Sequence, residues 1–230
     1  MRNLKTCIKE LEINGDPGMK LPEFCFDGLD NIENIVISGA VDVPRYMFEK
    51  CTGLKKVILK NGILSVGEYA FNGCSILESV IFENVALKKI SADMFSGCSA
   101  LSSIALPDSV TEIEKYAFFE TGLRNIQLPE KLTLIGAYAF CNCKNLEQVQ
   151  LPSQLKELGN GAFSSCENLA QIQLPSQLNK LGGDAFRDCT SLDKIDIPAG
   201  LKQIESGTFC NTGLTSVTLH EGLTKIEDWA

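Results

Sequence analysis

The chain has 230 residues, of which 21 are Lys or Arg and 29 are Asp or Glu, so its formal net charge is −8 with the only histidine neutral. This acidic balance argues against nucleic acid and anionic lipid as partners, because both require a basic patch. With 44% hydrophobic residues, the chain can bury a substantial core. No apolar run approaches the roughly 18 residues of a membrane span, so we expect no direct membrane insertion.

A phenylalanine recurs along the chain at intervals of 22 to 24 residues. An aliphatic residue follows each one, five or six positions later. A period of this length is typical of a solenoid, in which a unit buries its apolar face only by stacking on its neighbours. The recurring residues are Phe26, Phe48, Phe71, Phe95, Phe118, Phe140, Phe163, Phe186 and Phe209.

Each unit is predicted to open with a short, half-buried strand, because aliphatic residues alternate there with polar ones, as at Leu146, Val149 and Leu151. The first strand is a partial unit at 8–13, and nine more follow. The sequence therefore predicts about ten parallel strands in a sheet about 45 Å long, at about 4.8 Å per strand. Prolines that end the ladder close many of these strands, at Pro107, Pro129, Pro152, Pro175 and Pro198.

The second half of each unit is predicted to contain a second extended segment and then a turn or a one-turn helix around the phenylalanine. A second apolar pair precedes the next phenylalanine, for example Leu155 and Leu158. No unit has the helical periodicity that a longer helix needs. Because glycine tolerates positive φ, we predict tight bends with positive φ where glycine follows this pair, at Gly67, Gly136, Gly159 and Gly182.

Residues 139–159 read AFCNCKNLEQVQLPSQLKELG, and the other units follow the same pattern of Ala-Phe, Cys, Leu, Ile, Leu-Pro, Leu and Ile-Gly. This pattern resembles the BspA-like leucine-rich repeat over nearly the whole chain. The resemblance implies a leucine-rich repeat right-handed superhelix, an α/β-to-mainly-β solenoid with a parallel β-sheet on one face and about 23 residues per repeat. Thr121 and Thr212 replace the cysteine in units one residue shorter, where we expect tighter loops.

Members of the BspA-like family are surface proteins of bacteria or microbial eukaryotes that attach to host proteins, matrix or other cells. The resemblance therefore implies non-catalytic recognition or adhesion, by a protein that is at the cell surface or secreted. A structural or intracellular scaffolding array that docks a partner domain is the alternative. We expect residues 1–230 to form one solenoid domain of about nine to ten repeats, and because neither end resembles a polar cap, we expect a fragment of a longer array.

The positions of the cysteines favour a packing role over a disulfide framework or a metal site. We interpret the six that stand three residues after a repeat phenylalanine as buried, reduced thiols, although neighbouring turns come close enough for disulfides. Only Cys141 and Cys143 form a close pair of metal ligands, so we expect no metal and no cofactor. Catalysis by a nucleophile and a base would depend on His220, which we interpret as a solvated loop residue, and we expect no enzyme. The six are Cys51, Cys74, Cys98, Cys143, Cys166 and Cys189.

The outward strand positions are where a ligand would bind, and they divide the sheet face in two. The first half carries Val36, Ile58 and Ile81, which predict an apolar interface with an adjacent segment or, by self-association, with a second copy. The second half carries amides that can bind a protein backbone or sugar hydroxyls, or else hydrogen-bond one another along the stack. The amides are Asn125, Gln127, Gln148, Gln150, Gln171 and Gln173.

A third set of residues is aromatic and stands two positions before the repeat phenylalanine or its expected equivalent. We interpret this column as packing along the rim, with recognition as the alternative. It is not a continuous aromatic ladder, because it is interrupted at Asp93, Gly161, Asp184 and Gly207. Its members are Tyr46, Tyr69, Tyr116, Tyr138 and Trp229.

Overall fold

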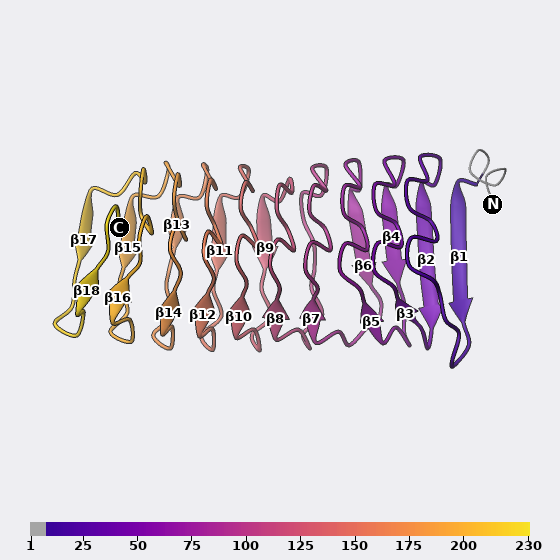
Figure 1. The fold of residues 1–230 in the computed structure, drawn as a ribbon, viewed down its shortest axis with the longest axis horizontal. Helices are drawn as coiled ribbons and strands as arrows, with labels where there is room; N and C mark the ends of the chain where they lie inside the picture. Colours follow the sequence, from indigo (N-terminus) through magenta and orange to yellow (C-terminus); the bar gives the residue numbers. More distant parts are fainter. Residues whose placement is uncertain (1–7) are drawn as a thin grey trace.

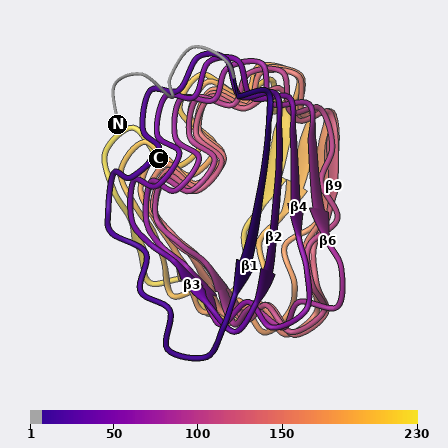
Figure 2. The same cartoon turned by 90° about the vertical axis from the view of Figure 1, so that its right-hand side faces the viewer.

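The computed structural model describes residues 8–230, in which each repeat is one turn of a parallel β-solenoid. A strand crosses one side of the molecule, a bend leads to a two-residue strand on a second side, and a non-helical turn returns the chain to the start (Figure 2). Figure 1 shows the turns stacked in chain order, with β1 at one end of the stack and β17 and β18 at the other. The expected fold class, with about 23 residues per repeat, is confirmed.

The first side carries the longer strands in three separate ladders, β1–β2–β4–β6, β9–β11–β13 and β15–β17. Between β6 and β9, the turn at 101–107 contributes only an isolated bridge, in which Ala105 pairs with Gln127, so the expected single sheet is interrupted. The strands are β1 (Glu10–Gly15), β2 (Asn34–Gly39), β4 (Lys56–Leu59), β6 (Ser79–Phe82), β9 (Asn125–Gln127), β11 (Gln148–Gln150), β13 (Gln171–Ile172), β15 (Lys194–Asp196) and β17 (Ser216–Thr218).

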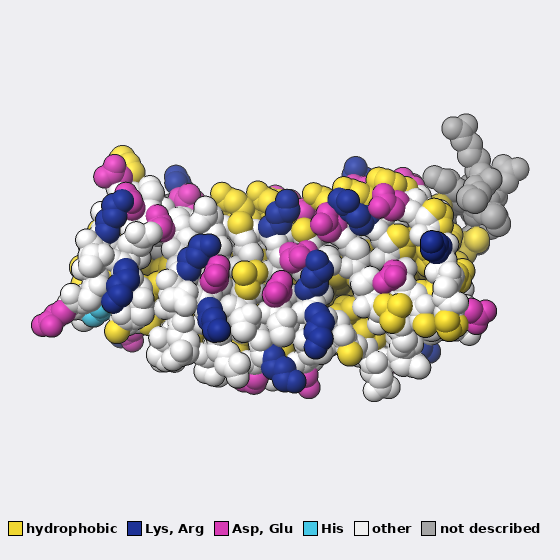
Figure 3. All heavy atoms as spheres, turned by 60° about the horizontal axis from the view of Figure 1, so that its bottom comes forward, with side chains coloured by type: hydrophobic (Ala, Val, Ile, Leu, Met, Phe, Trp, Pro, Cys, Tyr) yellow, Lys and Arg dark blue, Asp and Glu magenta, His cyan; other side chains and the backbone are white. Residues whose placement is uncertain are grey.

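The second side carries the short strands, whose ladder runs without a break from β7 to β14. Figure 3 brings the lower edge of Figure 1 forward and shows basic and acidic side chains interspersed on it. Ion pairs join neighbouring turns on this side, such as Lys89 with Glu114 at 2.8 Å. The strands are β3 (Asp42–Val43), β5 (Ser65–Val66), β7 (Lys89–Ile90), β8 (Glu112–Ile113), β10 (Leu134–Ile135), β12 (Glu157–Leu158), β14 (Lys180–Leu181), β16 (Gln203–Ile204) and β18 (Lys225–Ile226).

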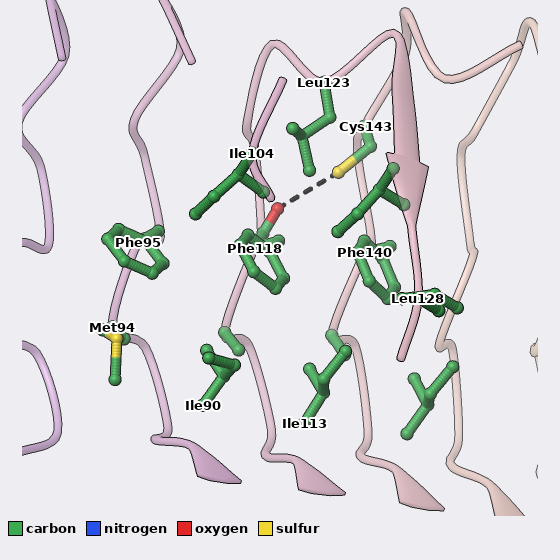
Figure 4. Packing of buried hydrophobic residues seen from close by; sticks show 14 of the residues in the cluster. Ile90, Met94, Phe95, Ile104, Ile113, Phe118, Leu123, Leu128, Phe140 and Cys143 are labelled. Carbon is green, nitrogen blue, oxygen red and sulfur yellow. Dashed lines mark hydrogen bonds between the residues drawn. The ribbon is translucent and has the colours of Figure 1, made fainter. Parts of the chain in front are cut away.

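The repeat phenylalanines form a stacked column through the core. From Phe26 to Phe209, successive ring centroids lie 5.2 to 5.9 Å apart and the ring planes are within 17° of parallel. Figure 4 shows three of these rings in a row among aliphatic side chains. The backbone of the same turn is also hydrogen-bonded from repeat to repeat, since the Phe140 N–H donates to the Ala162 carbonyl at 2.8 Å. Three hydrogen-bonded rows therefore join the repeats.

The cysteine column lies beside the phenylalanine column. The Cys143 thiol donates to the Phe118 carbonyl of the preceding repeat at 3.1 Å (Figure 4), and the equivalent thiols do the same. At Thr121, in a shortened unit, the hydroxyl instead donates to the Phe118 carbonyl of its own repeat at 2.9 Å, which closes the turn locally. The described cysteines are all free thiols, and burial raises the pKa of Cys51, Cys143 and Cys189 to about 12.

The prediction of positive φ at the glycines after the second apolar pair is wrong. Gly67, Gly136, Gly159 and Gly182 do not have positive φ. They are sites of close approach instead: a Cβ on Gly159 would lie 2.4 Å from the backbone nitrogen in the preceding turn, with similar collisions at the other three. Positive φ occurs mostly at residues two before and two after the repeat phenylalanine, where side chains such as Tyr, Asp and Asn occur.

Candidate ligand-binding face

The six predicted amides lie side by side on the long-strand side. They occupy β9, β11 and the start of β13, except for Gln173, which follows β13 directly. Gln148 pairs in register with Asn125 on one side and Gln171 on the other, and Gln150 pairs with Gln127. All six side chains are exposed. They therefore form two rows that cross the strands, one at the first strand position and one at the third.

A groove of about 680 Å³ lies over these rows. All six amides line it, and the strand residues between the rows, Ile126, Val149 and Ile172, are only 5 to 7% exposed. The groove extends onto β15, where Lys194 and Asp196 line it together with Asp193, which directly precedes the strand. The sequence did not point to these three residues as part of a site. Their repeat spacing could have done so, because Lys194 and Asp196 stand 23 residues after Gln171 and Gln173.

The amide side chains of the groove are exposed and make no hydrogen bond within the described chain. In the part of the chain that the structure describes, none of their side chains hydrogen-bonds another side chain or the backbone. The alternative in which the amides satisfy one another along the stack is therefore not what the structure has. Each side chain presents a donating N–H₂ group and an accepting oxygen to solvent. The walls of the groove can bind groups that are both donors and acceptors.

The predicted apolar residues are also neighbours, but they are less exposed than we expected. Val36 pairs in register with Ile58, and Ile58 with Ile81. All three are half-buried. Branched side chains in adjacent strands, about 4.8 Å apart, cover one another, which removes much of their surface from water. The apolar patch is correspondingly smaller than the sequence predicts.

The aromatic column packs along the rim of the solenoid. Tyr46 and Tyr69 stack with ring centroids 4.7 Å apart, and Tyr116 and Tyr138 stack at 5.1 Å. Phe24, which the sequence analysis did not include, extends the first stack with its ring 4.5 Å from Tyr46. These contacts support the interpretation as rim packing for the tyrosines.

A catalytic site at His220, a metal site and a membrane span find little support in the described residues. His220 is half-buried rather than solvated, and its Nδ1 accepts a hydrogen bond from the Gly222 N–H at 3.0 Å. Within residues 8–230, no group of three or more His, Cys, Asp or Glu side chains is placed to hold a metal ion. Over the same range, no helix has the length and apolar character of a membrane span.

Comparison with known proteins identifies the repeat. The sequence matches the BspA type leucine rich repeat region over residues 19–140 and 111–230. A leucine-rich repeat protein from Bacteroides ovatus is 31% identical with a TM-score of 0.75; the similarity covers 94% of this chain and 53% of that chain. This chain thus spans about half the length of that protein. No curated protein matches the sequence.

Two further solved structures match over most of this chain. A leucine-rich repeat protein from Eubacterium ventriosum is 15% identical, with a TM-score of 0.60, covering 96% of this chain and 82% of its own. A leucine rich cell surface protein from Faecalibacterium prausnitzii is 25% identical, with a TM-score of 0.47; the similarity covers 86% of this chain and 69% of that chain. Because the family match spans residues 19–140 and 111–230, which is most of the sequence, the chain belongs to the BspA-type leucine-rich repeat family.

Proposed function

We propose that the chain is a non-catalytic recognition module that binds a protein or glycan through its long-strand side, at a cell surface or in secreted form. The observation that carries this proposal is the groove lined by six exposed amides, whose side-chain donors and acceptors have no hydrogen-bond partner among residues 8–230. The surface location is supported by membership of the BspA-type family, whose members attach to host proteins, matrix or other cells.

Amide side chains suit a ligand that is polar but uncharged. Each hydrogen bond adds only about 0.5–1.5 kcal/mol of net free energy, so useful affinity requires several at once. The groove meets this requirement because three consecutive turns contribute two amides each. Recognition spread over several repeats is also the usual mode of binding by solenoid surfaces.

A second candidate function is a scaffolding array in which Val36, Ile58 and Ile81 dock a partner domain or a second copy. Their register across three strands supports it, because they form one continuous apolar row. We expect the double substitution Ile58→Lys with Ile81→Lys to lower the mass measured by light scattering if the row joins two copies. An unchanged mass would rule out self-association through this row.

The recognition proposal is tested by a binding screen against matrix proteins and polysaccharides. The substitutions Gln150→Glu and Gln173→Glu place two charges in the groove and are expected to weaken binding at least tenfold. Gln154→Glu and Gln177→Glu are the matched control, because both residues are exposed and lie outside the groove. Equal binding by the two double variants would contradict the placement of the site.

A further inference from the structure

We infer that the ligand of the groove is a linear, uncharged polysaccharide whose chain crosses the strands and runs along the solenoid axis. This inference rests on the proposed function, because it assigns a ligand class and an orientation to the same groove.

The dimensions of the groove suit a chain of sugar rings. The two amide rows stand two residues apart on each strand, a separation of roughly 6.6 Å. Along each row, neighbouring side chains are one strand spacing apart, and three spacings of about 4.8 Å separate β9 from β15. The centre-to-centre distance between the rows is therefore comparable to one pyranose ring, and the groove is about 14 Å long. An extended chain of pyranose rings advances by about one strand spacing per sugar, so successive sugars meet one amide pair on each of three turns and then Lys194 with Asp196 on the fourth.

The chemistry of the walls matches sugar hydroxyls. A hydroxyl both donates and accepts a hydrogen bond, and so does an amide side chain. The pairs Asn125 with Gln127 and Gln148 with Gln150 face the channel from its two sides, and none of these side chains is engaged elsewhere in the described chain. Among the described residues, no aromatic side chain lines the groove, so hydrogen bonds to hydroxyls, rather than stacking on the sugar rings, would carry the affinity.

An extended peptide fits the groove less well. Peptides that bind a sheet through their main chain add to an exposed edge. At the centre of the groove, β11 is already paired with β9 on one side and β13 on the other, so it offers no edge. A peptide also advances by about 3.3 Å per residue, which does not match the strand spacing of about 4.8 Å. Its contacts with successive amides would fall out of step.

The charges around the groove disfavour an acidic glycan. Over three turns the walls are uncharged amides, and on the fourth the carboxylates of Asp193 and Asp196 flank Lys194. The whole chain carries a net charge of −8. A uronate or sulfate group would meet repulsion both at the end of the groove and from the molecule as a whole.

The inference is tested by calorimetric titration of the protein with neutral linear oligosaccharides of one to six sugars, including gluco- and manno-oligosaccharides of different linkage. For the linkage that binds, we expect affinity to rise with each added sugar up to about four, where the channel ends, and then to level off. Gln150→Glu with Gln173→Glu should weaken binding at least tenfold, and Gln154→Glu with Gln177→Glu should leave it unchanged. Circular dichroism checks that each variant is folded.

The outcomes separate this inference from the proposed function. If a protein ligand binds and the groove variant loses it, while no neutral oligosaccharide binds, the polysaccharide inference is overturned and the proposed function stands. If an anionic polysaccharide binds more tightly than a neutral one, the inference is likewise overturned. If no protein and no glycan binds, or if the groove variant binds as the control does, both proposals fail.

Discussion

Replacing Phe140 with leucine tests whether the stacked column holds the repeats together. The ring is fully buried, and its centroid lies 5.2 Å from those of Phe118 and Phe163. The substitution removes two aromatic pairs, each contributing about 0.5–1.5 kcal/mol beyond the area that it buries. The smaller side chain also leaves a gap that costs about 1 kcal/mol. We therefore expect the free energy of unfolding to fall by about 2–4 kcal/mol.

The matched control is Phe209→Leu. Phe209 is half-buried and stacks on Phe186 alone, at 5.9 Å, so its replacement should cost about 1 kcal/mol. Both variants are measured by urea denaturation followed by far-ultraviolet circular dichroism. Since a solenoid is held together by contacts between neighbouring turns, we also expect Phe140→Leu to broaden the transition more than the control does. Equal losses in the two variants would refute the assignment of stability to paired stacking.

Three other substitutions or conditions give clear expectations, each read from the midpoint of urea denaturation. Gly159→Ala should destabilise the protein by more than about 1 kcal/mol, because its Cβ would lie 2.4 Å from the backbone nitrogen of Ala137; a neutral effect would contradict the close approach. Burial raises the pKa of Cys143 from 9.0 to about 12, so above pH 9 the folded state binds more protons than the unfolded state. The free energy of unfolding should therefore fall as the pH rises from 9 towards 12. An unchanged free energy of unfolding from about pH 8 to about pH 10.5 would argue against the raised pKa. Burial raises the pKa of the Asp93 carboxyl, whose Oδ2 lacks a hydrogen-bond partner among the described residues. Asp93→Asn should therefore raise the free energy of unfolding by about 1 kcal/mol at pH 7 and by less at pH 3. A lower free energy of unfolding at pH 7 would contradict this expectation.

The repeating parts of the fold were predictable because each column requires one kind of side chain. The phenylalanine spacing identified the turns, and the alternation of Leu146, Val149 and Leu151 identified a strand whose Gln148 and Gln150 point outward. Outward residues at one repeat position in successive turns must be neighbours in a parallel ladder. The amide rows of the candidate site were therefore visible in the sequence.

Backbone geometry was less predictable, because one residue type serves more than one purpose. Glycine at position 159 permits close packing of two turns, whereas we assigned it to a positive φ. Tyr138, with φ of 57°, shows that the left-handed position accepts an aromatic residue when neighbouring rings stack on it. The reduced exposure of Ile58 likewise depends on how adjacent side chains cover one another, which a linear pattern does not record.

The isolated bridge between Ala105 and Gln127 gives the solenoid an uneven stiffness. At this turn the long-strand side is joined by one bridge, whereas on the short-strand side β8 continues an unbroken ladder between β7 and β10. Bending at this point should therefore stretch the long-strand side while the short-strand side keeps its length. The apolar row at Val36, Ile58 and Ile81 precedes this weakly joined turn in the stack, and the amide groove follows it. A rigid partner that touched both would fix the curvature of the whole rod, whereas a ligand confined to the groove would leave it free to bend.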